Sequence, residues 1–158
     1  RRTTLIALLI GLAAGGTLAI AQTASQHNHA IFTPADLKWV DGPPSLPKGV
    51  KMAVLEGNPR DAGPFTLRFM LPAGTKVAPH WHPGIEHVTV LSGMFNIGLG
   101  EKFDEMALKA LPPGGFVMMQ PKTPHFVQVK EETTIQVHAI GPWGVTYVNP
   151  EDDPSKKS

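Results

Sequence analysis

Residues 74–93 read GTKVAPHWHPGIEHVTVLSG and bring three candidate metal ligands together within a short stretch. His80 and His82 are two residues apart, so on an extended strand both side chains leave the same face. Glu86 follows the Pro-Gly turn at positions 83–84 and can fold back toward that face. The spacing predicts a cluster of two imidazoles and one carboxylate.

A fourth ligand is expected from another strand, and His125, at the end of the sequence QPKTPH, is placed to supply it. Imidazole and carboxylate donors suit one divalent transition metal ion, such as Fe, Mn, Ni, Cu or Zn, and do not suit the all-oxygen preference of Ca²⁺. The predicted metal ligands are therefore His80, His82, Glu86 and His125. Four protein ligands leave an octahedral ion two positions for water or substrate, which is what a catalytic site needs.

The pattern Gly74-x5-His80-x-His82-x3-Glu86-x6-Gly93 matches every fixed position of the first motif of the cupin superfamily. Five residues must fall at set intervals, so this match is specific. The chain resembles a small, exported, single-domain cupin of the cupin-2 type.

The second cupin motif is present in part. Gly114 and His125 are in register with it, and His125 is the residue that would bind the metal. Gln120, Lys122 and Val129 stand where the motif usually has Pro, Gly and Asn. Lys122 therefore occupies the position of a turn glycine.

The resemblance implies an all-β fold, an antiparallel double-stranded β-helix or jelly-roll barrel, with the metal in its mouth. The two motifs and the strands around them span residues 65–148. The resemblance also implies a homodimer formed through barrel strands.

Composition points to the same fold class. Sixteen Gly and sixteen Pro among 158 residues suit short strands joined by tight turns, and 42% hydrophobic residues suit one packed core. The segment FTLRFML at 65–71 alternates with period two, as a strand does. Further strands are expected at 51–55, 87–91, 94–99, 116–119, 126–130, 133–140 and 144–148, while 101–111 could be a short helix or an irregular loop.

The first residues resemble an export signal. Arg1 and Arg2 precede an apolar run at 5–20, and the small residues around Ala21 suit cleavage there. A membrane anchor is the alternative, and the arginine pair leaves open whether export is general or twin-arginine. We expect a signal peptide at 1–21, an N-terminal arm with the first strand at 22–64, the barrel core at 65–148 and a tail at 149–158. The mature protein is expected to be periplasmic or extracellular.

The charge of the chain argues against two classes of partner, and its lack of cysteine excludes several kinds of chemistry. Without Arg1 and Arg2 the chain has 12 basic and 13 acidic residues, from totals of 14 and 13, and no basic cluster. Nucleic-acid binding and stable membrane association after cleavage are not expected. The chain has no cysteine, so a disulfide, a thiolate ligand and a cysteine nucleophile are excluded.

Three polar residues outside the ligand set are candidate catalytic residues. Gln136 and His138 share one face of a late strand and, if that face is inward, reach toward the metal. Arg68 lies in an alternating strand and, if inward, could anchor a carboxylate substrate. A surface position for Arg68 and a backbone-bonded core position for His138 are the alternatives. His87 follows Glu86 directly and is expected to point away from the site.

Two functions fit these residues. The first is a mononuclear metal-dependent enzyme acting on a small molecule, with an oxygenase-like reaction of the dioxygenase kind favoured over isomerase, lyase or hydrolytic chemistry. The alternative is a non-catalytic module that binds a metal or a small ligand, because a shared fold does not settle function.

Overall fold

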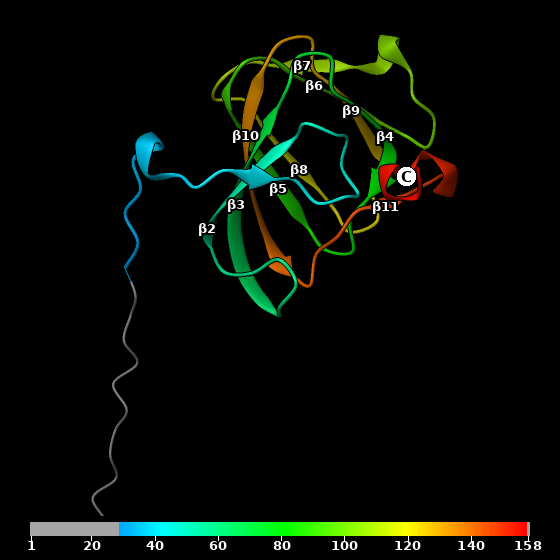
Figure 1. The fold of residues 1–158 in the computed structure, drawn as a ribbon. Coiled ribbons are helices and arrows are strands. Elements are labelled where there is room, and N and C mark those ends of the chain that lie inside the picture. Colours follow the sequence, from blue (N-terminus) through cyan, green and yellow to red (C-terminus); the bar gives the residue numbers. More distant parts are fainter. Residues whose placement is uncertain (1–28, 158) are drawn as a thin grey trace, which may run out of the picture.

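The computed structural model describes residues 29–157, which form short strands and single turns of 3₁₀ helix (Figure 1). The strands are β1 (Val40–Asp41), β2 (Lys51–Glu56), β3 (Gly63–Leu71), β4 (Lys76–Trp81), β5 (Glu86–Ser92), β6 (Phe95–Leu99), β7 (Lys109–Leu111), β8 (Phe116–Met119), β9 (His125–Gln128), β10 (Thr133–Gly141) and β11 (Thr146–Tyr147). The 3₁₀ helices are η1 (Pro34–Asp36), η2 (Glu105–Ala107), η3 (Pro150–Asp152) and η4 (Pro154–Lys156).

The strands form two antiparallel sheets that face each other. The six-stranded sheet has the order β1-β2-β3-β10-β5-β8, and the five-stranded sheet has the order β11-β4-β9-β6-β7. From β3 to β6, and again from β7 to β11, successive strands alternate between the sheets, so the chain winds around a common core (Figure 1). The predicted all-β jelly-roll fold is confirmed.

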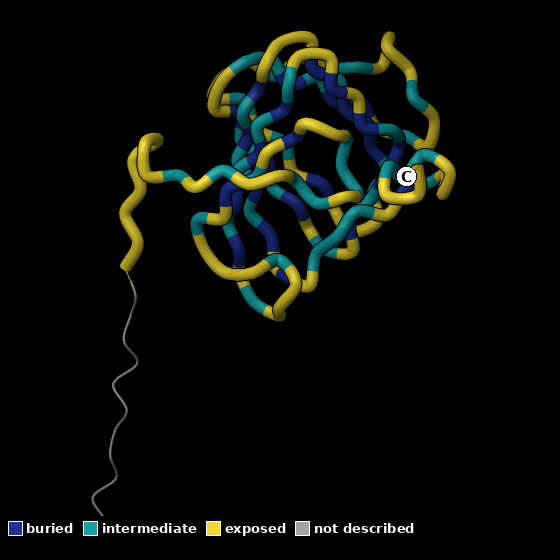
Figure 2. The backbone as a smooth tube through the Cα atoms, in the orientation of Figure 1, coloured by how far each residue is buried: buried dark blue, intermediate teal, exposed yellow. Residues whose placement is uncertain are grey.

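The core lies between the two sheets. In β3 the alternate residues from Phe65 to Leu71 are buried, as the period-two pattern predicts, and the residues between them are only partly buried. The neighbouring β10 buries Ile135 and Val137 in the same way. Buried segments of both sheets face one another in Figure 2. Burying one such apolar side chain stabilises the fold by roughly 1.5–3 kcal/mol.

Two segments differ from the sequence-based expectation, and one of them is the strand expected at 144–148, which is only the two residues of β11. Residues 101–111, expected to be a helix or a loop, contain η2 and then β7, which extends the five-stranded sheet by pairing with β6. Residues 29–39 run away from the barrel before β1 joins β2 (Figure 1). In this arm Ile31 is 92% exposed.

The expected signal peptide and the first residues of the arm lie outside the described residues. Within residues 29–157, no helix is long and apolar enough to cross a membrane.

Candidate metal centre

Two neighbouring strands of the five-stranded sheet carry the histidines. His80 on β4 lies directly opposite His125 on β9 in their antiparallel register. His82 comes just after the last residue of β4. The backbone N–H of Lys122 donates a 2.8 Å hydrogen bond to the carbonyl of His82, which joins the end of β4 to the turn before β9. Strand pairing thus brings together residues that are far apart in the sequence.

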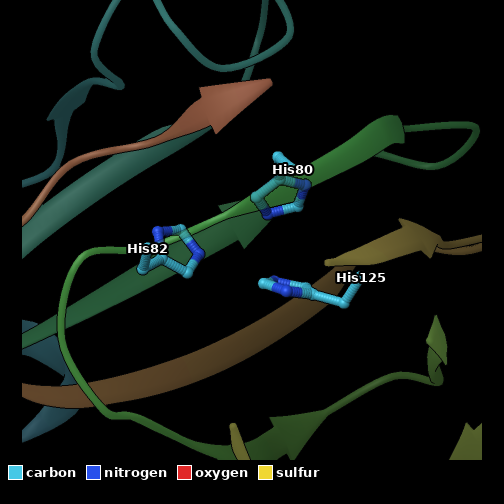
Figure 3. A group of neighbouring side chains, drawn as sticks. All are labelled: His80, His82 and His125. Atoms are coloured by element: carbon cyan, nitrogen blue, oxygen red, sulfur yellow. The ribbon is translucent and has the colours of Figure 1, made fainter. Parts of the chain in front are cut away.

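The three imidazoles face one another between these strands (Figure 3). One ring nitrogen from each of His80, His82 and His125 lies within 4.8 Å of the others. The residues are buried, with exposed fractions of 4%, 4% and 2%. Three nitrogen donors grouped at this separation could hold one metal ion.

Each ring is oriented by a hydrogen bond from its Nδ1 to a backbone carbonyl. These bonds run from His80 to Ala78 at 2.8 Å, from His82 to Gly144 at 2.8 Å and from His125 to Thr123 at 3.0 Å. A carbonyl oxygen only accepts, so each Nδ1 carries the proton and each Nε2 keeps its lone pair. Hydrogen bonds of this kind fix the tautomer and orientation of histidines that bind metals.

Glu86 begins β5 in the opposite sheet and extends into the same space. Its Oε2 lies 3.4 Å from Nε2 of His82 and 3.8 Å from Nε2 of His125. Its ligand atom does not belong to the group within 4.8 Å that the three histidines form. Glu86 thus contacts two of the three imidazoles, and its place as a fourth ligand stays a prediction.

Burial sets the protonation of these groups in the absence of metal. It raises the pKa of Glu86 to about 8. Burial, together with the neighbouring His125, lowers the pKa of His82 to about 3. Burial is also the main cause that lowers the pKa values of His80 and His125. At neutral pH the three imidazoles are therefore neutral and able to bind a metal, while Glu86 has to lose a proton to do so.

The histidines and Glu86 occupy one part of the wall of a cavity between the sheets, with a volume of about 50 Å³. The rest of the wall is apolar and includes Phe69, Val88, Val137 and Trp143. By comparison, a cavity of about 150 Å³ holds a benzene molecule. The cavity therefore suits waters or a ligand of a few heavy atoms.

The segment between β10 and β11 contributes to the site. The sequence suggests that Trp143 packs in the barrel and could border the pocket, but it does not predict the contacts of this segment with His82. Trp143 stacks on the ring of His82 with centroids 4.3 Å apart and an interplanar angle of 16°. The next residue, Gly144, supplies the carbonyl that orients His82. In the sequence, the only signal is the break Gly-Pro-Trp at 141–143 between the strands expected at 133–140 and 144–148. Nothing local connects this break with His82.

The candidate catalytic residues are not part of this site. Arg68 and Gln136 are partners in the register of β3 and β10, on the face opposite the buried residues. Arg68 Nε donates to Gln136 Oε1 at 2.8 Å, and Gln136 Nε2 donates to His138 Nε2 at 2.9 Å. The idea that these three residues point toward the metal is wrong, because both strands turn their apolar residues inward.

His87 lies on this same outer face, as expected for the residue after Glu86. It is opposite His138 in the register of β5 and β10. Its ring stacks on Phe116 with centroids 6.0 Å apart. His87 therefore points away from the cavity.

Lys122 forms the turn that a glycine forms in the usual second cupin motif. Its φ is 61°, in the left-handed region of backbone conformation that residues other than glycine rarely adopt. The turn still forms, and its hydrogen bond to His82 is in place. The departure from the motif at this position therefore leaves the histidine cluster intact.

Comparison with solved structures finds the same fold. The chain is similar to the polyketide cyclase RemF from Streptomyces resistomycificus, with a TM-score of 0.64 and 19% identity over 82% of this chain and 92% of that one. It is similar to a proposed acetylacetone dioxygenase from Methylibium petroleiphilum PM1, with a TM-score of 0.63 and 19% identity over 82% and 88% of the two chains. It is also similar to the DMSP lyase DddQ from Ruegeria pomeroyi DSS-3, with a TM-score of 0.58 and 19% identity over 74% and 64%.

Among proteins with curated functions, none matches this sequence significantly. The model of the ChrR cupin-like domain family matches residues 26–143, which is most of the chain. This match agrees with the jelly-roll fold and the buried histidine cluster. The chain belongs to the ChrR cupin-like domain family of the cupin superfamily.

Proposed function

We propose that this protein is a mononuclear metal-dependent enzyme that acts on a small molecule, and that its reaction is oxygenase-like. One observation carries the proposal: three buried imidazoles, each with Nε2 free, meet in the wall of an apolar cavity. A site that served only to stabilise the fold would not need a cavity beside the ligands.

The donor set fits a divalent transition metal. His80, His82 and His125 would hold the ion through Nε2, and Glu86 would complete the set with a carboxylate oxygen. When bound, the ion supplies Lewis-acid or electron-transfer chemistry to a substrate oxygen. The chain's own contribution is to exclude water through the apolar wall and to hold the three imidazoles in a fixed orientation.

The enzymes with a similar fold support a small-molecule substrate. Their names describe a cyclase, a proposed dioxygenase and a lyase, all acting on small molecules. Identities near 19% support the fold alone, so the oxygenase-like reaction rests on the histidine-rich donor set.

A second candidate function is a non-catalytic module that binds a metal or small ligand. It is favoured by the chemistry of the cavity wall, where the described residues include no titratable side chain beyond the three histidines and Glu86. A catalyst that needs a separate acid or base would lack one here. An oxygenase-like reaction by electron transfer through the metal makes the smallest demand for a separate acid or base, which adds to the preference that the donor set gives it.

Metal analysis of the wild type, His82→Ala and His87→Ala tests the proposal. Each protein is purified without chelators or a metal-affinity tag, and its metal content is measured by mass spectrometry. We expect about one equivalent of Fe, Mn, Ni or Cu in the wild type and in His87→Ala, whose changed ring lies on the outer face. His82→Ala is expected to lose it.

Oxygen consumption is then screened with small ketones and carboxylates, with His82→Ala as the baseline. Oxygen consumption by the wild type but not by His82→Ala supports the enzymatic function. A stoichiometric metal without oxygen consumption favours the non-catalytic binding module. Zinc in the wild type would contradict redox chemistry, and absence of any metal would contradict the metal centre itself.

We also propose that residues 1–21 direct export and are removed. The charged, apolar and small-residue parts of this segment support the proposal. Sequencing the N-terminus of the protein from its native host should then find Gln22 first. Recovery of an uncleaved chain in the membrane fraction would support the anchor instead.

A further inference from the structure

The wall of the cavity restricts which molecules fit beside the metal ligands. Apart from His80, His82, Glu86 and His125, every lining side chain is apolar or aromatic, and both sheets contribute to it. Arg68, the one cation considered as a substrate anchor, is on the outer face. A polar group on a bound molecule, placed far from these four residues, would lose its hydrogen bonds to water and find no replacement partner in the wall.

Trp143 is the exception in this wall. It is the only lining residue outside the ligand set whose side chain has a strong hydrogen-bond donor. Its Nε1 is buried and has no hydrogen-bond partner among the described residues. Buried donors without a partner are rare, because each one loses its bond to water without replacement.

The position of Trp143 is well defined. Its backbone N–H donates a 2.7 Å hydrogen bond to the carbonyl of Pro59. Its ring lies nearly parallel to that of His82 at 4.3 Å and meets Phe65 edge-on at 5.8 Å. The stacking keeps the indole against the imidazole of His82, which lines the same cavity.

We propose that the site takes a small molecule with one or two oxygen atoms at one end and an aliphatic body, and that the Trp143 N–H donates a hydrogen bond to the oxygen end. This inference rests on the metal centre proposed above. The cavity volume of about 50 Å³ limits the ligand to a few heavy atoms. Trp143 is then a residue that positions the substrate and selects for it.

The test uses two probes of the same size in the wild-type protein loaded with Co²⁺. Acetohydroxamic acid and hydroxyurea share a metal-binding head, and differ only by a methyl group in place of an amino group. Binding is followed by the visible absorption of Co²⁺. We expect acetohydroxamic acid to bind at least tenfold more tightly than hydroxyurea, after correction for the ratio of their affinities for free Co²⁺ in water.

The Trp143→Phe variant tests the donor, because Phe keeps an aromatic ring on His82 and removes the N–H. It is expected to load Co²⁺ like the wild type and to bind acetohydroxamic acid about tenfold more weakly. Trp81→Phe is the matched control, since Trp81 does not line the cavity, and should behave like the wild type.

Each outcome separates the two proposals. Failure of the wild type to bind Co²⁺ would overturn the metal centre. Normal Co²⁺ binding with equal corrected affinities for the two probes would overturn the aliphatic substrate class alone. Unchanged affinity in a folded, Co²⁺-loaded Trp143→Phe protein would overturn the role of the indole N–H.

Discussion

His82 and Gly144 are joined by a 2.8 Å hydrogen bond from the imidazole Nδ1 to the backbone carbonyl, although they are 62 positions apart in the chain. His80 and His125 bond instead to carbonyls two residues earlier, so their orientation is set locally. The orientation of His82 therefore depends on the segment between β10 and β11. Metal affinity and the structure of that segment should be coupled.

Inserting one glycine between Trp143 and Gly144 should weaken metal binding. The insertion displaces the carbonyl that His82 bonds to, and loss of such a partner typically costs 10–100-fold in metal affinity. Competition titration with a chromophoric chelator measures the Zn²⁺ affinity. A glycine inserted between the exposed residues Glu101 and Lys102 is the control, and should leave it unchanged. Equal affinities in the two insertion variants would show that the Gly144 bond does not orient the ligand.

The stability of the metal-free protein should be greatest near pH 6.5. The pKa of Glu86 rises from 4.5 to about 8 on folding, so between these values the folded state holds a proton that the unfolded state lacks. This makes the free energy of unfolding fall as the pH rises, by up to about 1.4 kcal/mol per pH unit. The pKa of His82 is lowered from 6.5 to about 3, so His82 acts in the opposite direction below pH 6.5. The pKa values of His80 and His125 are lowered in the same sense. Below pH 6.5 the three histidines together therefore make the free energy of unfolding rise with pH, against the opposite effect of Glu86.

Urea denaturation of the metal-free protein from pH 5 to pH 9 measures this curve. In Glu86→Gln the decline between pH 6.5 and pH 8 should disappear, because the substituted side chain does not titrate. A decline that persists in Glu86→Gln would assign it to another group.

Metal binding at pH 7 should release about one proton. Burial raises the pKa of Glu86 to about 8, so its carboxyl is mostly protonated before binding and must ionise to act as a ligand. Calorimetric titration with Zn²⁺ in buffers of different ionisation enthalpy counts the protons. Glu86→Gln should release none, and an equal release by wild type and variant would exclude Glu86 as the fourth ligand.

Lys122→Gly should stabilise the protein by about 0.5–1 kcal/mol. The φ of 61° at Lys122 costs a residue with a Cβ more than it costs glycine, and this gain exceeds the added entropy of glycine in the unfolded chain. Urea denaturation at constant pH gives the difference. Lys130→Gly, at another exposed lysine without a positive φ, should not stabilise the protein. A Lys122→Gly protein no more stable than the wild type would contradict the strain.

Arg68→Leu and Gln136→Leu should bind metal with unchanged stoichiometry and affinity. Both side chains lie on the outer face of the six-stranded sheet, separated from the histidines by the sheet and the core. The same metal analysis checks this, with His82→Ala as the variant that loses the ion. Loss of metal from either outer-face variant, while it remains folded, would mean that this face affects the site.

Much of the histidine cluster could be predicted from local sequence. Two histidines at spacing two leave an extended strand on one face, wherever the strand lies, and the turn at 83–84 limits where Glu86 can go. The alternation at 65–71 is similarly local, because a strand with one buried face must repeat every two residues. These features depend on the backbone geometry of a few consecutive residues, which the sequence determines by itself.

The direction in which each strand faces was decided by the tertiary structure. An alternating strand has two faces, and either could be buried. Arg68, Gln136 and His138 lie on the outer face because the two sheets pack their apolar residues against each other. The placement of Trp143 and Gly144 against His82 has the same origin. Such contacts join segments far apart in the chain, and no local pattern encodes them, because they arise only when the whole core closes.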